Sequence, residues 1–322
     1  MSGLASTPRT LIIGAGCMGQ FVAEACLDAG IPTYILIRST RNPPSKTETI
    51  KALQNKGAVI VHGCIEDQPL LEKILREHKI EVVISTVVCF LEQLHLVEAI
   101  KAVGTVKRFL PSEFGHDVDR VDPVEPALSL YKIKKKVRTE TEKAGIPYTY
   151  ICCNSIAGWP YHDNVHPSEV LPPLDAFKIY GDGTVKAYFI TGSDIGKFTA
   201  KAITDERAVN KTIHFRPKSN MFNVNELASL WEKKIGRTLP RKFMTEEDLL
   251  TAVKELPLPG NVVSALTHDI FIKGCQVRYS LDKPADIDVC SLYPDTPFQS
   301  MDECFDEFIA KFPEALRAPS HN

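Results

Sequence analysis

The residues best suited to proton transfer lie in two polar segments in the first half of the chain. RFLPSEFGHD spans residues 108–117 and includes His116, and YKIKKKVR spans residues 131–138 and includes Lys134. A lysine beside other cations has a lowered pKa, which makes its amine a usable general base. A row of cations on a helix is also typical of an ordinary solvated face. The residue types alone therefore leave a catalytic and a solvated lysine equally open.

A glycine-rich turn, GAGCMG, lies near the start of the chain at residues 14–19. It follows the apolar run Thr10–Ile13 and precedes a helical pattern of apolar residues. The first glycine permits a tight turn, the second lets the backbone approach phosphate, and the third lets the helix pack on the strand. The N–H groups at the start of such a helix bind a pyrophosphate. We therefore expect a dinucleotide site at Gly14, Gly16, Cys17, Met18 and Gly19.

Cations follow the second apolar run, Thr33–Ile37, at the position where NAD enzymes usually have an acidic residue. Arg38, Arg41 and Lys46 put positive charge where the 2′-phosphate of NADP would lie, and a carboxylate there would repel it. A solvated loop position explains Arg41 most readily. The sequence thus favours NADP(H) over NAD, with Arg38 as the main contact.

Apolar runs alternate with helical patterns over the first 155 residues, which predicts right-handed crossovers and a parallel sheet. The expected fold is α/β, a Rossmann-type doubly wound sheet. Both polar segments would then lie beyond the carboxyl ends of strands, where open sheets bind ligands. The expected strands are Thr10–Ile13, Thr33–Ile37, Ala58–Val61, Val82–Ser85, Lys107–Leu110 and Tyr148–Cys152.

The pattern loosens at a proline-rich stretch that cannot be one regular helix. Its prolines are Pro160, Pro167, Pro172 and Pro173. We expect an NADP-binding domain over residues 1–157 and a smaller, mainly substrate-binding α+β lobe over residues 158–322, some of whose segments return to the first sheet. Helices are predicted over Val224–Ile235 and Thr245–Lys254, the second with a Thr245–Asp248 capping box.

Composition excludes several classes of protein. The 322 residues are 44% hydrophobic and 24% charged, which suits a soluble globular chain, and a formal charge of -2 gives no basic field for nucleic acid. The nine cysteines form no CxxC pair and no zinc-like spacing, so we expect reduced thiols and no metal. No signal-peptide pattern and no run of about 18 apolar residues occurs, which predicts a cytoplasmic protein without a membrane span.

The segment RFLPSEFGHDVDRVDPVEP, residues 108–126, resembles a signature of the plant isoflavone reductase-like enzymes, an atypical short-chain dehydrogenase group within the NmrA-like proteins. ICCNSIA (151–157) and THDIFI (267–272) resemble the members that reduce flavan-3,4-diols. The resemblance implies an NADPH-dependent oxidoreductase of flavonoid biosynthesis that replaces the 4-hydroxyl of a flavan-3,4-diol, a leucoanthocyanidin, with hydrogen. The product would be a flavan-3-ol of the catechin type. A monomer or homodimer acting on a small phenolic molecule is expected.

The resemblance also implies roles for individual residues. Lys134 would accept a phenolic proton, which helps to expel the C4 hydroxyl and leaves a quinone methide, and His116 would assist through an ordered water. Ser85, Thr86, Val87, Arg138, Cys153 and Asn154 would lie at the cofactor. Ser112, His116, Ser155 and His268 would lie at the substrate, although a buried structural role is an equal reading of His268.

A second assignment of the base is also consistent with this helix. Tyr131 and Lys135 match the YxxxK pair of ordinary short-chain dehydrogenases, in which the tyrosine is the acid/base. Lys134 and Lys135 are three and four residues from Tyr131, so helical spacing does not separate the two assignments. The neighbouring SEFG and GHD steps favour Lys134.

Two segments depart from the family pattern. The turn GAGCMG is one residue shorter than the usual GATGFIG, and Val88, Cys89 and Phe90 stand where the family has paired glycines. Bulkier residues there are expected to narrow the edge of the ligand site.

Two other functions stay open, namely reduction of an isoflavone, a pterocarpan-like ether or another phenylpropanoid, and NADP sensing without turnover. The presence of His116 and Lys134 favours an enzyme.

Overall fold

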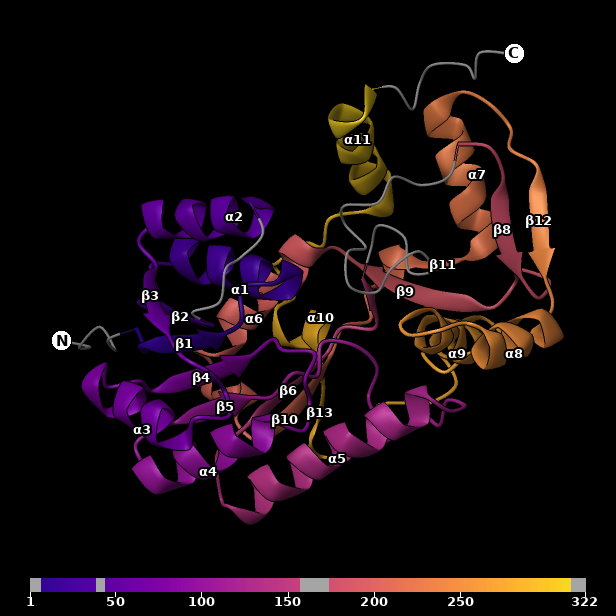
Figure 1. The fold of residues 1–322 in the computed structure, drawn as a ribbon. Helices are drawn as coiled ribbons and strands as arrows, with labels where there is room; N and C mark the ends of the chain where they lie inside the picture. Colours follow the sequence, from indigo (N-terminus) through magenta and orange to yellow (C-terminus); the bar gives the residue numbers. More distant parts are fainter. Residues whose placement is uncertain (1–6, 39–43, 157–173, 314–322) are drawn as a thin grey trace.

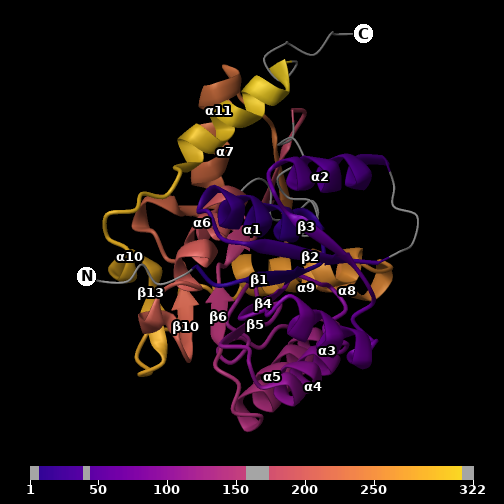
Figure 2. The same cartoon turned by 90° about the vertical axis from the view of Figure 1, so that its left-hand side faces the viewer.

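A parallel sheet forms the centre of the first of two lobes in the computed structural model, which describes residues 7–38, 44–156 and 174–313 (Figure 1). An isolated parallel bridge between Phe109 and Tyr148 joins five strands to three more. Figure 2 shows the two sets side by side. The order is β3 (Val59–His62), β2 (Thr33–Ile37), β1 (Thr10–Ile13), β4 (Val82–Ser85), β5 (Arg108–Leu110), then β6 (Thr149–Cys152), β10 (Lys211–His214) and β13 (Asp286–Asp288). The predicted doubly wound α/β fold is confirmed.

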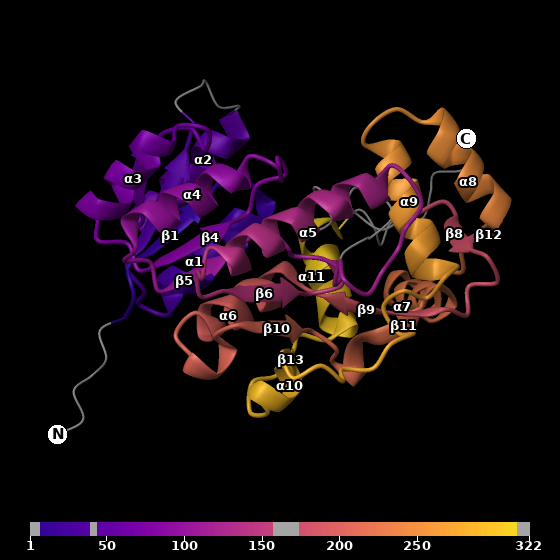
Figure 3. The ribbon, with the colours of Figure 1, turned by 90° about the horizontal axis from the view of Figure 1, so that it is seen from below.

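Helices cover both faces of this sheet (Figures 1 and 3). Leu11 and Ile13 pack into the cluster that includes α3 and α4, while Ile12 packs with residues of α1 and α6. Because helices bury both faces of the sheet, the inner strands are continuous apolar runs and do not alternate between apolar and polar residues. One face carries α1 (Cys17–Asp28), α2 (Pro44–Asn55) and α6 (Gly192–Ala202), and the other α3 (Gln68–Glu77), α4 (Gln93–Val103) and α5 (Ala127–Lys143).

The predicted strands differ from the observed ones at their ends. The third begins at Val59 rather than Ala58, and Val59 is 45% exposed because β3 lies at the edge of the sheet. The fifth and sixth each begin one residue later than predicted, at Arg108 and Thr149. Apolar periodicity locates strands more reliably than it locates their first residue.

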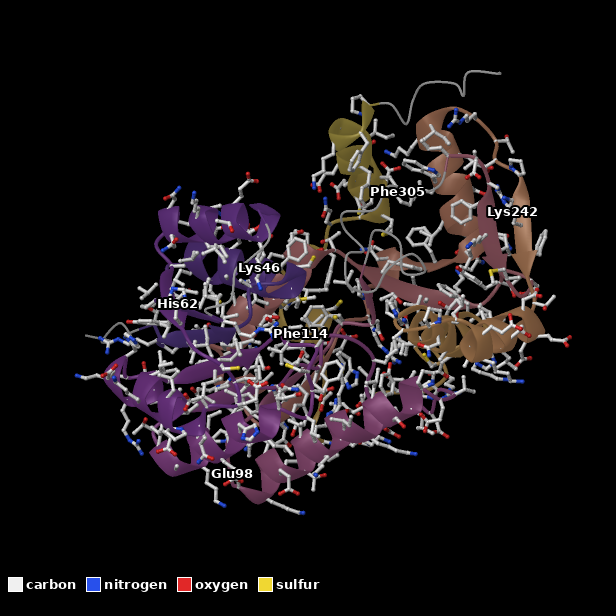
Figure 4. The ribbon with its side chains drawn as sticks, in the orientation of Figure 1. Lys46, His62, Glu98, Phe114, Lys242 and Phe305 are labelled. Carbon is white, nitrogen blue, oxygen red and sulfur yellow. The ribbon has the colours of Figure 1, made fainter. Side chains whose placement is uncertain are left out.

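The second lobe packs helices against short strands around large aromatic side chains. Phe177, Phe189 and Phe271 are fully buried there, and Trp231 packs on Phe305, labelled in Figure 4, at a centroid distance of 5.3 Å. Its strands are β7 (Ser155–Ile156), β8 (Phe177–Tyr180), β9 (Lys186–Ile190), β11 (Met221–Asn223) and β12 (Arg241–Met244). Its helices are α7 (Val224–Ile235), α8 (Glu246–Glu255), α9 (Gly260–Phe271) and α11 (Met301–Lys311). The short α10 (Val289–Leu292) follows β13 in the first lobe.

The helix predictions for this lobe are confirmed. Helix α7 has the predicted bounds, and α8 starts one residue after its N-cap, Thr245, which forms the predicted capping box with Asp248. The proposed division between residues 157 and 158, and the four prolines beside it, lie outside the described residues, so that boundary stays a prediction. The nine cysteines all lie in described parts and form no disulfide. No helix in the described ranges is long and apolar enough to cross a membrane.

The glycine turn has the backbone that its three glycines permit. Gly14 has φ +100°, in the region that side chains rarely adopt. A Cβ on Gly19 would lie 2.2 Å from the carbonyl oxygen of Gly14, whereas a Cβ on Gly16 would have no heavy atom within 4 Å. The third glycine therefore lets α1 approach β1, and the second leaves open space beside the turn.

We predict that Gly19→Ala destabilises the protein by about 1–3 kcal/mol, because the new methyl group forces the backbone of the turn apart. Gly16→Ala is the matched control and should destabilise less, because its methyl group meets no heavy atom within 4 Å and only the N-cap preference for glycine is lost. Thermal unfolding followed by circular dichroism measures both. Equal melting temperatures for the two variants would contradict this account of the turn.

Candidate active site

A buried arginine holds the segment after β5 against α5. Arg138, 4% exposed, donates through Nε and Nη2 to the two carboxylate oxygens of Glu113 at 3.0 and 2.9 Å. Its Nη1 donates to Asp117 at 2.8 Å and to Asp119 at 2.7 Å, and Nη2 also reaches Cys152 Sγ at 3.7 Å. All five N–H groups of the guanidinium are thus engaged. A contact of Arg138 with the cofactor, as the resemblance implied, would require one of these bonds to break.

Lys134 lies one helical turn before Arg138 and faces the same loop. Its Nζ donates to the backbone oxygen of Glu113 at 2.7 Å and stands 4.5 Å from the ring centroid of Phe90. Burial lowers the pKa of Lys134, Arg138 lowers it further, and Glu113 opposes both. A lowered pKa increases the fraction of neutral amine, the form that accepts a proton.

His116 stands in a chain of buried hydrogen bonds. Its Nδ1 lies 2.7 Å from the hydroxyl of Tyr131 and its Nε2 lies 3.0 Å from Nε2 of Gln276. The same amide nitrogen of Gln276 donates to Ser155 Oγ at 2.6 Å. Burial lowers the pKa of His116 to about 4, with a further contribution from Lys134. His116 is therefore neutral near pH 7.

These contacts bear on the two assignments of the base. The hydroxyl of Tyr131 is hydrogen-bonded to His116, and burial raises its pKa well above the ordinary value, which opposes loss of its proton. Both lysines are partly exposed, but Lys134 donates to the carbonyl of Glu113 and has a lowered pKa. The geometry supports Lys134.

The carboxyl ends of β1 and β4 form a cradle around the glycine turn. Helix α1 begins without a side-chain cap and without an acidic residue in its first turn, which leaves its first N–H groups for an anion. Thr86 donates from Oγ1 to the carbonyl of Ile13 at 3.0 Å, and Val87 lies beside Gly14. Ser85 Oγ is buried with no hydrogen-bond partner among the described residues. An open turn and an unpaired hydroxyl fit a dinucleotide.

Two of the predicted contacts for a 2′-phosphate, Arg38 and Lys46, follow β2 along the chain. Arg38 is exposed directly after β2, and its charge contributes to a lowered pKa of Glu66, after the hydrogen bonds that Glu66 accepts from Cys64 and its own backbone. Lys46 lies on α2, at the helix surface shown in Figure 4. Arg41 lies outside the described residues.

Three more predicted residues surround Lys134 and His116. Cys153 is buried, and burial raises its pKa to about 12 although Lys134 acts against this rise. Asn154 has φ +61° and donates to the carbonyl of Phe215 at 2.8 Å. Ser112 is held by its backbone N–H, which donates to Gln93 Oε1 at 2.7 Å.

His268 is tied to a different part of the molecule. Buried on α9, it lies with Nε2 2.9 Å from Glu246 Oε1 on α8. In the described parts of the chain no hydrogen bond joins it to His116 or Lys134. The structure therefore shows a helix-to-helix contact for His268, and its contact with substrate stays a prediction.

Sequence reasoning missed Gln93 and Gln276. Gln93 is 1% exposed, and its amide joins the carbonyl of Phe90 to the backbone of Ser112, so that it connects the loops after β4 and β5. Gln276 reaches His116 across 160 residues of chain. Neither residue belongs to a motif, and only the folded chain brings them to the site.

A cluster of carboxylates and one histidine lies beside Arg138. Oxygens of Asp117 and Asp286 and a ring nitrogen of His214 lie within 4.8 Å of one another. Arg120 pairs with both carboxylates, and Arg138 adds a second guanidinium at Asp117. Two arginines therefore supply the positive charge that this cluster requires.

The family model described as "NmrA-like family" matches residues 6–305 of the chain. The chain belongs to the NmrA-like family. Leucoanthocyanidin reductase from Desmodium uncinatum is 56% identical over 313 residues, which cover 96% of this chain and 82% of that protein. Phenylcoumaran benzylic ether reductase from Ginkgo biloba is 43% identical over 305 residues, 94% of this chain and 99% of the relative.

Solved structures of similar proteins superpose closely on this fold. The binary complex of leucoanthocyanidin reductase with NADPH from Vitis vinifera gives a TM-score of 0.90 at 59% identity, covering 94% of this chain and 99% of that one. The family resemblance expected from the RFLPSEFGHD segment is confirmed.

Replacing Arg138 with methionine should destabilise the protein by about 3–5 kcal/mol, since Glu113 and Asp117 would keep buried charge without a partner. Lys136→Met is the matched control, because Lys136 lies exposed on the same helix, and should change stability by no more than about 0.5 kcal/mol. Denaturant unfolding measures both. If the two variants unfold at the same denaturant concentration, the ion-pair cluster is not the anchor of this loop.

Proposed function

We propose that this protein is an NADPH-dependent reductase that converts a flavan-3,4-diol into a flavan-3-ol. The observation that carries the proposal is the amine of Lys134, which donates to the carbonyl of Glu113 at 2.7 Å and has a lowered pKa, beside His116 at the carboxyl edge of the sheet. Similarity to leucoanthocyanidin reductases over nearly the whole chain supports the choice of substrate.

The glycine turn and the end of β4 would hold NADPH. The N–H groups at Cys17 and Met18 would bind the pyrophosphate, and Arg38 and Lys46 the 2′-phosphate. The unpaired hydroxyl of Ser85 offers a further polar contact at this edge. A structural neighbour solved with NADPH supports the same cofactor here.

Neutral Lys134 accepts the phenolic proton of the substrate, and the resulting phenolate expels the C4 hydroxyl to leave a quinone methide. The N–H bond to the carbonyl of Glu113 keeps the amine in place while its lone pair takes the proton. Neutral His116 aids protonation of the departing hydroxyl through the hydroxyl of Tyr131, 2.7 Å from its Nδ1, and an ordered water. NADPH, when bound, supplies the hydride that C4 accepts. The C4 hydroxyl leaves as water with the proton relayed from His116, which solvent replaces, and the phenolate formed by hydride addition takes its proton back from Lys134.

Two other functions were considered for this site. The similarity to phenylcoumaran benzylic ether reductase favours, as a second candidate, reduction of a related phenylpropanoid, an isoflavone or a pterocarpan-like ether. An NADP-sensing regulator would need no lysine of lowered pKa, so Lys134 argues against it. A cytoplasmic location and a monomeric or homodimeric state belong to the same proposal.

The purified protein with NADPH should convert leucocyanidin into a flavan-3-ol and should leave an isoflavone and a pterocarpan largely unreacted, as chromatography of the products measures. Lys134→Ala should lose at least about 100-fold in kcat, because the proton acceptor is gone, while its affinity for NADPH stays close to that of the unmodified protein. Unchanged turnover in this variant would rule out Lys134 as the base. Tight NADPH binding without turnover of any of the three compounds would favour the regulator.

Arg38→Glu should weaken NADPH binding far more than NADH binding, because the 2′-phosphate is the only difference between the two and a carboxylate repels it. Fluorescence titration with each cofactor measures the two dissociation constants. The loss for NADPH should be at least about tenfold. An equal loss for both cofactors would show that Arg38 does not recognise the 2′-phosphate.

A further inference from the structure

A hydrogen bond from the backbone of Tyr188 determines the orientation of the side-chain amide of Gln276. Gln276 is 1% exposed and lies between α9 and β13, where Arg216 donates to its carbonyl oxygen at 2.6 Å. The backbone N–H of Tyr188 donates to its Oε1 at 2.7 Å. An N–H can only donate, so the acceptor end of the amide faces Tyr188 and the NH₂ end faces His116 and Ser155.

This orientation determines where the proton of His116 lies. The NH₂ group of Gln276 donates to Ser155 Oγ and to Nε2 of His116, so Nε2 has to be the acceptor. In a neutral imidazole the other nitrogen then carries the proton. Nδ1–H of His116 is accordingly the donor to the hydroxyl oxygen of Tyr131.

We propose that Gln276 is a positioning residue from the second lobe that holds His116 as the neutral Nδ1–H tautomer and so directs its proton toward Tyr131. The role of His116 in the reaction rests on the function proposed above, whereas the tautomer rests on the hydrogen bonds alone. An imidazolium would set a second N–H against the NH₂ of Gln276, so the same contact opposes protonation of the ring.

Among the charged groups near His116, Lys134 acts in the same direction, against protonation of the ring. Tyr131 and Lys134 face it from α5, and Lys134 adds positive charge. From the second lobe, Asp269 and Cys275 act on Tyr131, and Gln276 itself is uncharged. The lowered pKa of His116 agrees with a site that favours the neutral ring.

The tautomer can be measured directly in the unmodified protein. Long-range ¹H–¹⁵N correlation spectra separate the two neutral tautomers of a histidine, and the signal that disappears in His116→Asn identifies His116 among the nine histidines. We expect Nδ1 protonated and Nε2 unprotonated at pH 7. A dominant Nε2–H tautomer or an imidazolium would overturn the proposal, whatever the protein's activity.

Two variants test the part played by Gln276. Gln276→Met removes the donor, and the Nε2–H form of His116 should appear, with kcat lowered about tenfold and KM for NADPH unchanged. Gln276→Glu places a carboxylate at Nε2, which favours the protonated ring, so the pKa of His116 should rise and the acid limb of the kcat profile should move to higher pH. Gln299→Met, at a partly exposed glutamine of the same lobe, is the matched control and should behave like the unmodified protein.

An unchanged tautomer and an unchanged pH profile in both variants would overturn the positioning role. If the protein reduces none of the phenolic substrates, the proposed function fails, but the spectra of the unmodified chain and of Gln276→Met still decide the tautomer. A variant that does not fold, as melting curves would show, leaves the unmodified protein's spectrum as the deciding measurement.

Discussion

The buried pairing of Arg138 with Glu113 and Asp117 is the interaction on which the geometry of the site depends. A guanidinium forked onto one carboxylate fixes both the distance and the plane of its partner, as a lysine could not. With Glu113 held in this way, its backbone oxygen is placed for the amine of Lys134. The same arginine holds Asp117, directly beside His116 in the chain. One ion-pair cluster therefore sets the positions of both groups that handle protons.

The site is completed by the second lobe, which makes the contact between lobes part of its geometry. Helix α5 extends between the lobes (Figure 3), and Tyr131, near its N-terminal end, packs with residues of the second lobe. Gln276 approaches His116 from the second lobe, and Arg120 donates to the carbonyl of Ser280 in the same stretch of chain at 3.0 Å. Lys134 has its printed partners, Glu113 and Phe90, in the first lobe, whereas the hydrogen bonds of His116 also depend on the second. Proton acceptance and proton donation depend on different parts of the fold.

Sequence reasoning succeeded where the signal is local and failed where the partner is distant. The glycine turn, the first strands and the Thr245 capping box are each determined within a few residues, because strand burial, helix packing and capping act over that range. Helical spacing alone left Lys134 and Lys135 unseparated, since both lie near Tyr131, and the bond from Lys134 to the carbonyl of Glu113 separated them. The contact of Arg138 with the cofactor stays a prediction, and the carboxylates of Glu113 and Asp117 that pair with it were not visible as its partners in the sequence. No pattern in the sequence pointed to Gln276, because its role depends on a contact with His116 that forms only when the chain folds.

The loop after β4 shows how opposing effects set the proton affinity of Lys134. That Val88 and Phe90, in place of glycines, narrow the ligand edge stays a prediction; Val88 is 75% exposed in the structure. Phe90 instead places its ring on the amine of Lys134, an arrangement that favours the charged form. The bond to the carbonyl of Glu113 also favours an ammonium, while burial opposes it and dominates the direction of the pKa. Because Gln93 fixes the carbonyl of Phe90, this ring is positioned by the same loop contact that holds Ser112. The pKa of Lys134 is thus a balance between burial, which lowers it, and the contacts with Phe90 and the carbonyl of Glu113, which raise it. A ligand that displaces the ring of Phe90 removes one of these contacts and therefore favours the neutral amine.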